Sequence, residues 1–170
     1  TPIVNTTPTA DAGPDQNLCE YSTYLNGNNL EEGQTGNWTI ISGAGTFSDT
    51  NDPNTLVTNL SVGNNIFEWS ISAECTDGFG TSQVNINVVE EPSPNAGTDQ
   101  ELCLSQTVLN GNIVLDPVTM TSLGTWSIVS GSGNIQNIND PNTLVTNLGE
   151  GNNIFQWSFS SLLCGDFNDQ

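Results

Sequence analysis

Four cysteines are the residues whose type and spacing promise the clearest chemistry. Cys19 and Cys75 fall in the first half of the chain, and Cys103 and Cys164 hold matching places in the second. Four cysteines allow three pairings, but only Cys19–Cys75 with Cys103–Cys164 gives each half its own bond. We therefore expect two disulfides and an oxidising, extracellular setting. The sequence has no CxxC pair and no histidine, which leaves a zinc site little support.

The charged residues are all acidic, with 19 Asp and Glu and no Lys, Arg or His. Without His or Lys there is no Ser-His-Asp triad and no Schiff-base lysine, so only paired carboxylates remain for catalysis. The signatures Asp-Thr-Gly and Asp-Ser-Gly are missing. The acids with a counterpart in the other half, Asp15 with Asp99 and Asp52 with Asp140, are more simply turn or surface residues. We expect that the protein is not an enzyme.

The formal charge of −19 excludes two classes of partner. Nucleic acid binding requires cations that neutralise phosphates, and attraction to an anionic membrane surface requires them as well. The sequence also has no apolar stretch of about 20 residues, so we expect no direct membrane insertion.

Calcium is the cofactor that these acids could hold, because hard cations take oxygen ligands. The segment EEPSPNAGTDQE places Glu90, Glu91 and Asp99 close to backbone carbonyls. No EF-hand or RTX spacing accompanies them, and a solvated Pro-containing linker is the simpler interpretation. The alternatives are therefore no cofactor, or a calcium ion at Glu90, Glu91 and Asp99.

The chain repeats itself, because NDPNTLVTNL occurs at residues 51–60 and again at 139–148. The segment DAGPDQNLC at residues 11–19 likewise matches NAGTDQELC at 95–103. NDPN is a typical turn sequence, because Pro presets its backbone angle and Asx side chains form hydrogen bonds with nearby amides. Folding alone would tolerate variants there, so the identity favours recent duplication over a shared binding surface.

The repeat is long enough to be a domain. The units of most solenoids have about 20 to 50 residues and cannot bury a core alone, whereas roughly 85 residues can. We predict one repeat at residues 11–91 and a second at residues 92–170. Residues 1–10 would be a linker or the tail of a preceding repeat's last strand.

Period-two alternation predicts the strands. In FEWSISAEC (residues 67–75) and QVNINVV (residues 83–89), apolar side chains occupy alternate positions. Together with GNWTIISG, NTLVTNL and the opening segments, each repeat has about seven short strands and no helix. This pattern is typical of a Greek-key, immunoglobulin-like β-sandwich, so the fold class is all-β with two tandem sandwiches. Four tryptophans on the apolar faces are predicted core residues: Trp38, Trp69, Trp126 and Trp157.

The second repeat stops before the strand that SQVNINVV supplies in the first, since Gln170 corresponds to about Thr81. An unpaired sheet edge beside an exposed core is a liability. Two sources could supply the strand: continuation of the natural chain, or the N-terminal segment of another copy, as in donor-strand complementation.

The order of the motifs AGxDQxLC, LNGN, GxW, SGxG, DPN and NLxxGxNxFxW resembles the tandem Ig-like or PKD-like repeats of very large Bacteroidota surface proteins. These include gliding-motility-associated adhesins exported by type IX secretion. The resemblance runs from about Asp11 to Cys164. It implies a secreted, elongated cell-surface protein with adhesive or fibre-forming work, and it brings no catalytic residue and no receptor with it.

We therefore expect a non-enzymatic structural or adhesive repeat module of a large secreted cell-surface protein or fibre. It would act as a spacer or stalk in adhesion, gliding or surface attachment, and its partners would be further copies of the repeat. The alternatives are a module that binds a surface glycan or protein receptor through its loops, and a fibre subunit assembled by donor-strand exchange.

Overall fold

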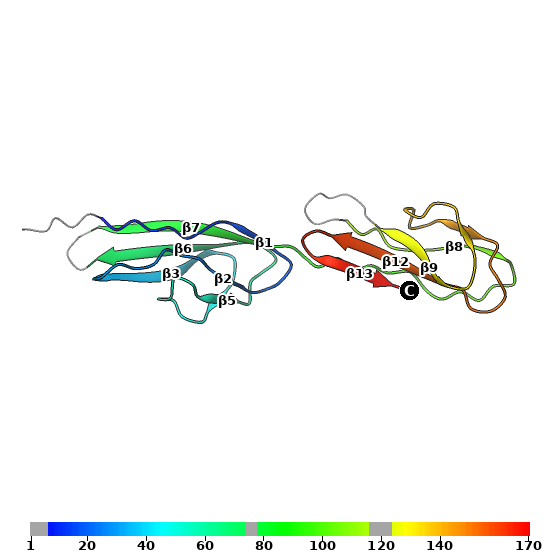
Figure 1. Ribbon diagram of the computed structural model, residues 1–170, viewed down its shortest axis with the longest axis horizontal. Helices are drawn as coiled ribbons and strands as arrows, with labels where there is room; N and C mark the ends of the chain where they lie inside the picture. Colours follow the sequence, from blue (N-terminus) through cyan, green and yellow to red (C-terminus); the bar gives the residue numbers. More distant parts are fainter. Residues whose placement is uncertain (1–6, 74–77, 116–123) are drawn as a thin grey trace, which may run out of the picture. The chain divides into compact units, whose positions relative to one another are not determined.

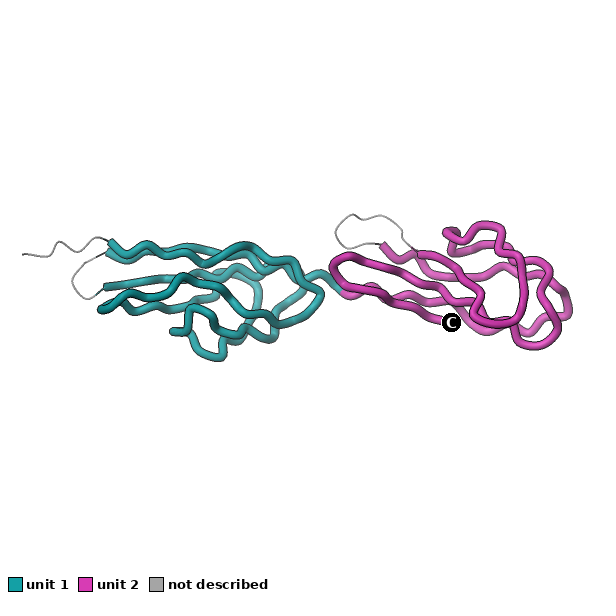
Figure 2. The backbone as a smooth tube through the Cα atoms, in the orientation of Figure 1, with its two compact units in different colours: residues 1–90 teal, residues 91–170 magenta. Residues whose placement is uncertain are grey.

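The computed structural model describes residues 7–73, 78–115 and 124–170. The chain divides into unit 1 (Thr1–Glu90) and unit 2 (Glu91–Gln170), which Figure 2 colours separately. The boundary between the units lies one residue before the predicted one. Every regular element in the described residues is a β-strand. The predicted fold class, two all-β immunoglobulin-like sandwiches, is confirmed.

Unit 1 is a sandwich of two sheets, and Figure 1 labels all of its strands except β4. The larger sheet has the order β1-β7-β6-β3 and the smaller one β2-β5-β4. Neighbouring strands are antiparallel except β1 and β7, which run parallel. The strands are β1 (Gln16–Leu18), β2 (Thr23–Tyr24), β3 (Gln34–Ser42), β4 (Thr46–Phe47), β5 (Leu56–Thr58), β6 (Gly63–Ala73) and β7 (Phe79–Val88).

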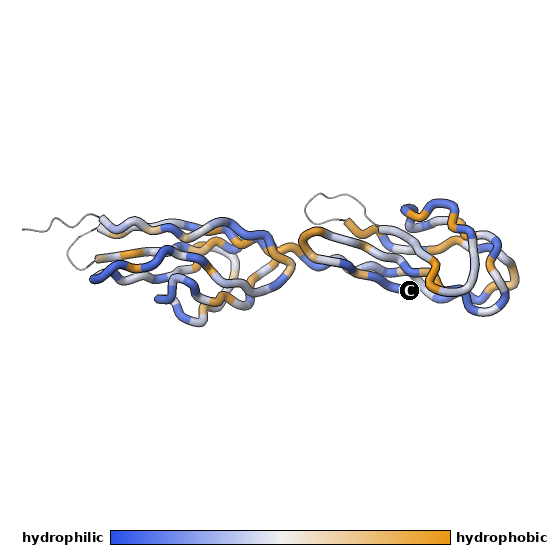
Figure 3. The backbone as a smooth tube through the Cα atoms, in the orientation of Figure 1, coloured by the Kyte–Doolittle hydropathy of each residue, from blue (hydrophilic) through white to orange (hydrophobic). Residues whose placement is uncertain are grey.

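Strands β6 and β7 form because their apolar residues alternate, so that one face of each strand can be buried. On β6 the side chains of Phe67, Trp69 and Ile71 are fully buried, as predicted. The predicted face of β7 is buried in the same way, with Val84, Ile86 and Val88 at most 1% exposed. In Figure 3, hydrophilic and hydrophobic colours interchange along the strands of each unit.

Paired tryptophans form the centre of each core. Trp38 lies opposite Trp69 in the register with ring centroids 5.0 Å apart, and Trp126 lies opposite Trp157 at the same distance. The GxW motif fits this packing, because a Cβ on Gly36 would overlap the ring of Trp69. Gly124 has the same relationship to Trp157. A glycine is required at both positions because the ring occupies the space of a side chain.

Unit 2 repeats this plan with fewer described strands. Its sheets have the orders β13-β12-β9 and β10-β11-β8. The strands are β8 (Gln106–Val108), β9 (Thr125–Ser130), β10 (Asn134–Ile135), β11 (Leu144–Thr146), β12 (Ile154–Ser161) and β13 (Gly165–Asp169).

The sheet register shows how much of the last strand unit 2 contains. Trp157 of β12 pairs with Asp169, and Trp69 of β6 pairs with Ser82. Gln170 therefore corresponds to Gln83, not to Thr81 as predicted. The sequence alignment was wrong because it matched Cys164 with Cys75, whereas Cys164 lies in the turn after Ser161.

The repeated decapeptide makes the same turn in both units. The Oδ1 atom of Asp52 accepts a hydrogen bond from the backbone N–H of Asn54 at 2.9 Å. In the second copy, Asp140 accepts from Asn142 at 2.9 Å. Such Asx turns fix the local backbone. Both copies of the decapeptide therefore serve the fold in the same way.

Candidate functional site

The predicted bond between Cys103 and Cys164 is not formed. Cys19 and Cys164 are disulfide-bonded, and Cys103 is a free, exposed thiol. The other predicted pair, Cys19–Cys75, stays a prediction, because Cys75 lies outside the described residues. A disulfide remains the bond of an oxidising compartment, in keeping with the extracellular setting that we expect.

The length of β12 explains why Cys103 and Cys164 do not meet. Cys103 lies beside the start of β12, where it lines a groove together with Asn152 and Phe155. Cys164 follows the end of the strand at Ser161, and the seven steps from Ile154 to Ser161 span about 23 Å. Two bonded cysteines have Cα atoms within about 7 Å of each other.

In unit 1, Cys19 likewise lies beside the start of a long strand. It follows Leu18, which pairs with Val88, and Val88 also pairs with Gly63 at the start of β6. The ten steps of β6 from Gly63 to Ala73 then carry the chain about 33 Å along the sheet. In the second repeat, matching places of the cysteines therefore did not indicate a bond.

The candidate calcium ligands do not form a metal site in the described part of the chain. No group of three or more His, Cys, Asp or Glu residues there could hold a metal ion. Glu90 and Glu91 lie after the end of β7, and Asp99 lines the groove of unit 2. Calcium at Glu90, Glu91 and Asp99 stays a prediction from composition alone.

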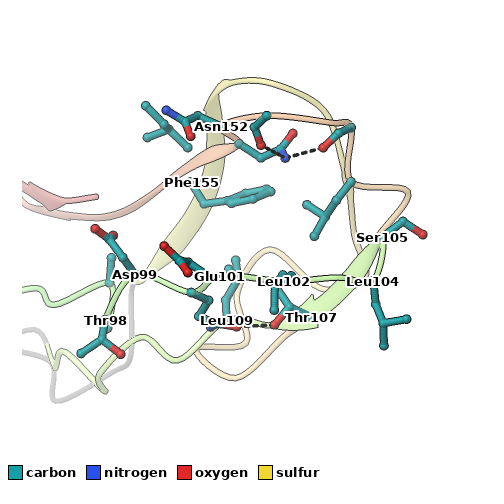
Figure 4. Close-up of a pocket in the computed structure, with 18 of the residues that line it drawn as sticks. Thr98, Asp99, Glu101, Leu102, Leu104, Ser105, Thr107, Leu109, Asn152 and Phe155 are labelled. Atoms are coloured by element: carbon teal, nitrogen blue, oxygen red, sulfur yellow. Dashed lines mark hydrogen bonds between the residues drawn. The ribbon is translucent and has the colours of Figure 1, made fainter.

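The feature of unit 2 with a defined shape is this groove, which has a volume of about 920 Å³ and is drawn in Figure 4. One wall is the segment from Ala96 to Ser105, and the other is the chain from Leu148 to Phe155. Gln170 also lines it, so β13 leads directly to the groove. We call it the strand groove below.

The corresponding place in unit 1 holds the second half of β7. There Val84 pairs with Phe67, and Val88 pairs with both Gly63 and Leu18. In unit 2, β13 pairs only with Trp157–Ser161. The edge of the sheet from Asn152 to Phe155 therefore faces the strand groove.

Apolar side chains that β7 covers in unit 1 are more exposed in unit 2. Phe67 is fully buried, whereas its counterpart Phe155 is 9% exposed. Leu18 packs against the core of unit 1, whereas its counterpart Leu102 is 46% exposed. Gln16–Leu18 form a strand against β7, whereas Gln100–Leu102 lie outside every described strand. Both walls of the groove thus expose apolar residues whose counterparts in unit 1 are covered by β7.

The buried side-chain amide of Asn65 also shows a difference between the two units at this position. The side-chain Nδ2 of Asn65 donates to the carbonyls of Ser61, Gly63 and Ile86 of β7. Its counterpart Asn153 donates to the carbonyls of Gly149 and Gly151. Asn153 therefore lacks a counterpart of the hydrogen bond from Asn65 to Ile86. The two units thus differ at the level of Ile86 on β7.

Sequence reasoning predicted that the second repeat stops short, but it missed the acids of the groove. Asp15 Oδ1 accepts the backbone N–H of Asn85 at 2.8 Å, so it fastens β7 from the side. Asp99 is the counterpart of Asp15, and Figure 4 shows Asp99 and Glu101 directed into the groove. The pairing of Asp15 with Asp99 in the repeat was the available signal.

Within the residues that the structure describes, no helix is long and apolar enough to span a membrane. The chain matches no known family model and no curated protein.

Three solved structures resemble the fold. The solution structure of the PKD domain from the KIAA 1837 protein is 29% identical, covers 56% of this chain and 100% of that one, and has a TM-score of 0.45. The PKD domain from human KIAA0319 is 22% identical, covers 55% and 88%, and has a TM-score of 0.40. A three-immunoglobulin-domain structure of titin is 14% identical with a TM-score of 0.42. It covers 94% of this chain, which spans 61% of the titin structure.

Proposed function

We propose that this chain is a non-enzymatic repeat module that carries tension in a secreted cell-surface protein or fibre. The finer role is that of a spacer or stalk in adhesion, gliding or surface attachment, with further copies of the repeat as partners. The observation that supports it most is the pairing of the first and last strands of unit 1. Gln16–Leu18 of β1 run parallel to Ile86–Val88 of β7.

Parallel end strands resist being pulled apart. A force along the chain pulls β1 from its N-terminal end and β7 from its C-terminal end, so it acts on the two strands in opposite directions along their axes. The hydrogen bonds between them are then loaded together in shear, and none of them opens first. A module that transmits tension needs this geometry, because forced unfolding depends on the barrier to unfolding.

Side chains fasten the same pair of strands. Besides the bond from Asn85 to Asp15, the Nδ2 of Asn87 donates to Asn17 Oδ1 at 3.0 Å. The backbone N–H of Val89 also donates to the Leu18 carbonyl at 2.8 Å. We call the β1–β7 pair with these bonds the strand clamp.

Composition supports the same role. The chain has no His, Lys or Arg, so it lacks the side chains that most catalytic arrangements require. Disulfide bonding of Cys19 and of Cys164 suits an extracellular protein. The resemblance to surface repeats of the Bacteroidota, including type IX secreted gliding adhesins, supports the localisation that we propose.

Single-molecule pulling of the chain by its ends, with its disulfide bonds reduced so that the force passes through β1 and β7, tests the proposal. The double variant Asp15→Ala with Asn17→Ala removes two side-chain bonds of the strand clamp, so unit 1 should unfold at a lower force. The matched control is Asn64→Ala with Glu68→Ala, which removes two side-chain bonds between β6 and β7. The control should leave the unfolding force close to that of the parent. Equal forces for the two double variants would refute the strand clamp and the tension-carrying role.

A further inference from the structure

We propose that Asn26 and Asn110 are sites of spontaneous deamidation, which the folded chain keeps closed and which react when the turn of the repeated decapeptide opens. The inference concerns a chemical modification and is independent of the strand clamp. It follows from three observations, which are the residue after each asparagine, the hydrogen bond of that residue's backbone N–H, and the extended course of the chain at this point.

Deamidation at an Asn-Gly dipeptide is an intramolecular reaction. The backbone nitrogen of the glycine attacks the side-chain carbon Cγ of the asparagine, loses its proton, and expels the side-chain amide as ammonia. Water then opens the cyclic succinimide at either of its carbonyls, which gives aspartate or isoaspartate. The net change consumes a water and releases an ammonia, so no oxidant or cofactor is needed. Glycine favours the attack because it has no Cβ to hinder it.

Asn-Gly occurs once in each repeat, as Asn26–Gly27 and Asn110–Gly111. Both asparagines are exposed, so water reaches their side chains, whereas both glycines are buried. The core requires a glycine here, because a Cβ on Gly27 would lie 3.0 Å from Cζ2 of Trp38. Gly111 meets the corresponding ring of the second unit at 2.9 Å. The fold thus places the residue that most favours deamidation directly after an exposed asparagine.

The attacking nitrogen of each pair is occupied in the folded chain. Gly27 donates its backbone N–H to the Pro53 carbonyl at 2.9 Å. Gly111 donates its backbone N–H to the Pro141 carbonyl at 2.8 Å. Base cannot remove a proton that is buried and hydrogen-bonded in this way, so the reaction waits until the bond to the decapeptide opens.

The backbone before Gly27 is fixed as well. Leu25, which is 1% exposed, donates its N–H to the Thr55 carbonyl at 2.9 Å, so residues 25–27 continue the pairing of β2 with β5. Side chains alternate along such an extended segment, and Asn26 points outward between two buried neighbours. The nitrogen of Gly27 reaches Cγ of Asn26 only after the chain turns at this point.

The rate of the reaction therefore reports how often the turn opens. When the pair closes again faster than it reacts, the rate follows the population in which the N–H of Gly27 has left the carbonyl of Pro53. Amide exchange at Gly27 requires the same opening. The fold should thus slow deamidation of Asn26 and amide exchange of Gly27 by about the same factor.

Isoaspartate, one of the products, does not fit the closed pair. At position 26 it leads the main chain through Cβ and so adds a methylene between Leu25 and Gly27. The N–H groups of these two residues then no longer match the spacing of the Thr55 and Pro53 carbonyls. An opening that lasts long enough to react is therefore recorded permanently in that repeat.

The test is to keep the 170-residue protein in mildly alkaline buffer and to follow both sites by peptide mass mapping, which detects the exchange of an amide for a carboxylate. The synthetic peptides YLNGNNL and VLNGNIV, which are residues 24–30 and 108–114, give the rates of the open form. Deamidation in the folded protein should be at least about tenfold slower than in the peptides. In urea the protein should lose this difference.

Two variants make the test specific, because each repeat is the control of the other. Asp52→Ala removes the Asx hydrogen bond of the first copy, so deamidation of Asn26 should become about fivefold faster. Asn110 of the same molecule should keep the rate of the parent. Asp140→Ala removes the equivalent bond of the second copy and should have the reverse effect.

Amide exchange of the Asp52→Ala variant separates opening of the turn from unfolding of the unit. Exchange should become faster at Gly27 and stay unchanged at Phe67 in the core strand β6. Equal acceleration at Phe67 would tie the reaction to unfolding of the whole unit and overturn the proposal. Equal deamidation rates in the folded protein and the peptides would overturn it too, and so would an unchanged rate at Asn26 in Asp52→Ala.

Discussion

The indole Nε1–H of Trp38 donates a hydrogen bond to the backbone carbonyl of Asp52 at 3.1 Å. Trp126 and Asp140 repeat it at 3.1 Å in the second unit. A tryptophan in the core thus holds the turn at the start of the repeated decapeptide. The same loop returns a bond to the strand, because the Nδ2 of Asn51 donates to the Gly36 carbonyl at 2.7 Å. In both copies the turn and the core therefore depend on each other.

A threonine inside the decapeptide tests this dependence. Thr55 is 2% exposed, and its Oγ1 accepts the backbone N–H of Asp49 at 3.0 Å. Thr55→Val keeps the shape and leaves that N–H without its acceptor, so the free energy of unfolding should fall by about 1–3 kcal/mol. Thr143→Val should cost unit 2 a similar amount, since Thr143 accepts from Asn137. The exposed Thr50→Val is the control in urea unfolding, and an equal loss there would contradict the prediction.

Trp69 and Trp157 hold matching places in the two units but differ in one hydrogen bond of the indole N–H. Trp157 Nε1–H donates to the Asn112 carbonyl at 3.0 Å, whereas the buried Nε1–H of Trp69 has no partner among the described residues. Replacing Trp by Phe removes similar volume at both sites. Only Trp157→Phe also removes a hydrogen bond, and Trp69→Phe removes an unsatisfied donor. Trp157→Phe should therefore destabilise its unit by about 1 kcal/mol more than Trp69→Phe, measured by unfolding each variant in urea. The reverse order would show that Trp69 has a bonding partner.

Cysteine reactivity tests the revised bonding. Cys103 is exposed and free, so a thiol reagent should modify it fully in the native, unreduced protein. Cys19 and Cys164 should react only after reduction, because they are disulfide-bonded. Peptide mass mapping reads out both results. Protection of Cys103 before reduction would restore the predicted bond in the second repeat.

Alternation predicted the core strands but not their neighbours. Phe67, Trp69 and Ile71 follow period two, so the burial of β6 could be derived from sequence. The parallel pairing of Leu18 with Val88 could not, because it joins residues 70 positions apart and leaves no local pattern. The predicted bond Cys103–Cys164 was wrong for a related reason, since nothing local indicated that Cys103 lies beside the start of β12 and Cys164 beyond its end. The strand groove was predicted only as a missing strand, because the exposure of Leu102 depends on pairing between strands that lie far apart in the sequence.

The direction in which force opens unit 1 tests the central claim most directly. Site-specific handles at Thr9 and Glu90 load the parallel strand clamp in shear. Handles at Val62 and Glu90 flank the pair Gly63 and Val88, so they open the antiparallel β6–β7 pair one step at a time. The account predicts that unit 1 yields at a clearly higher force through Thr9 and Glu90 than through Val62 and Glu90. Equal forces in the two directions would contradict the role of the module in carrying tension.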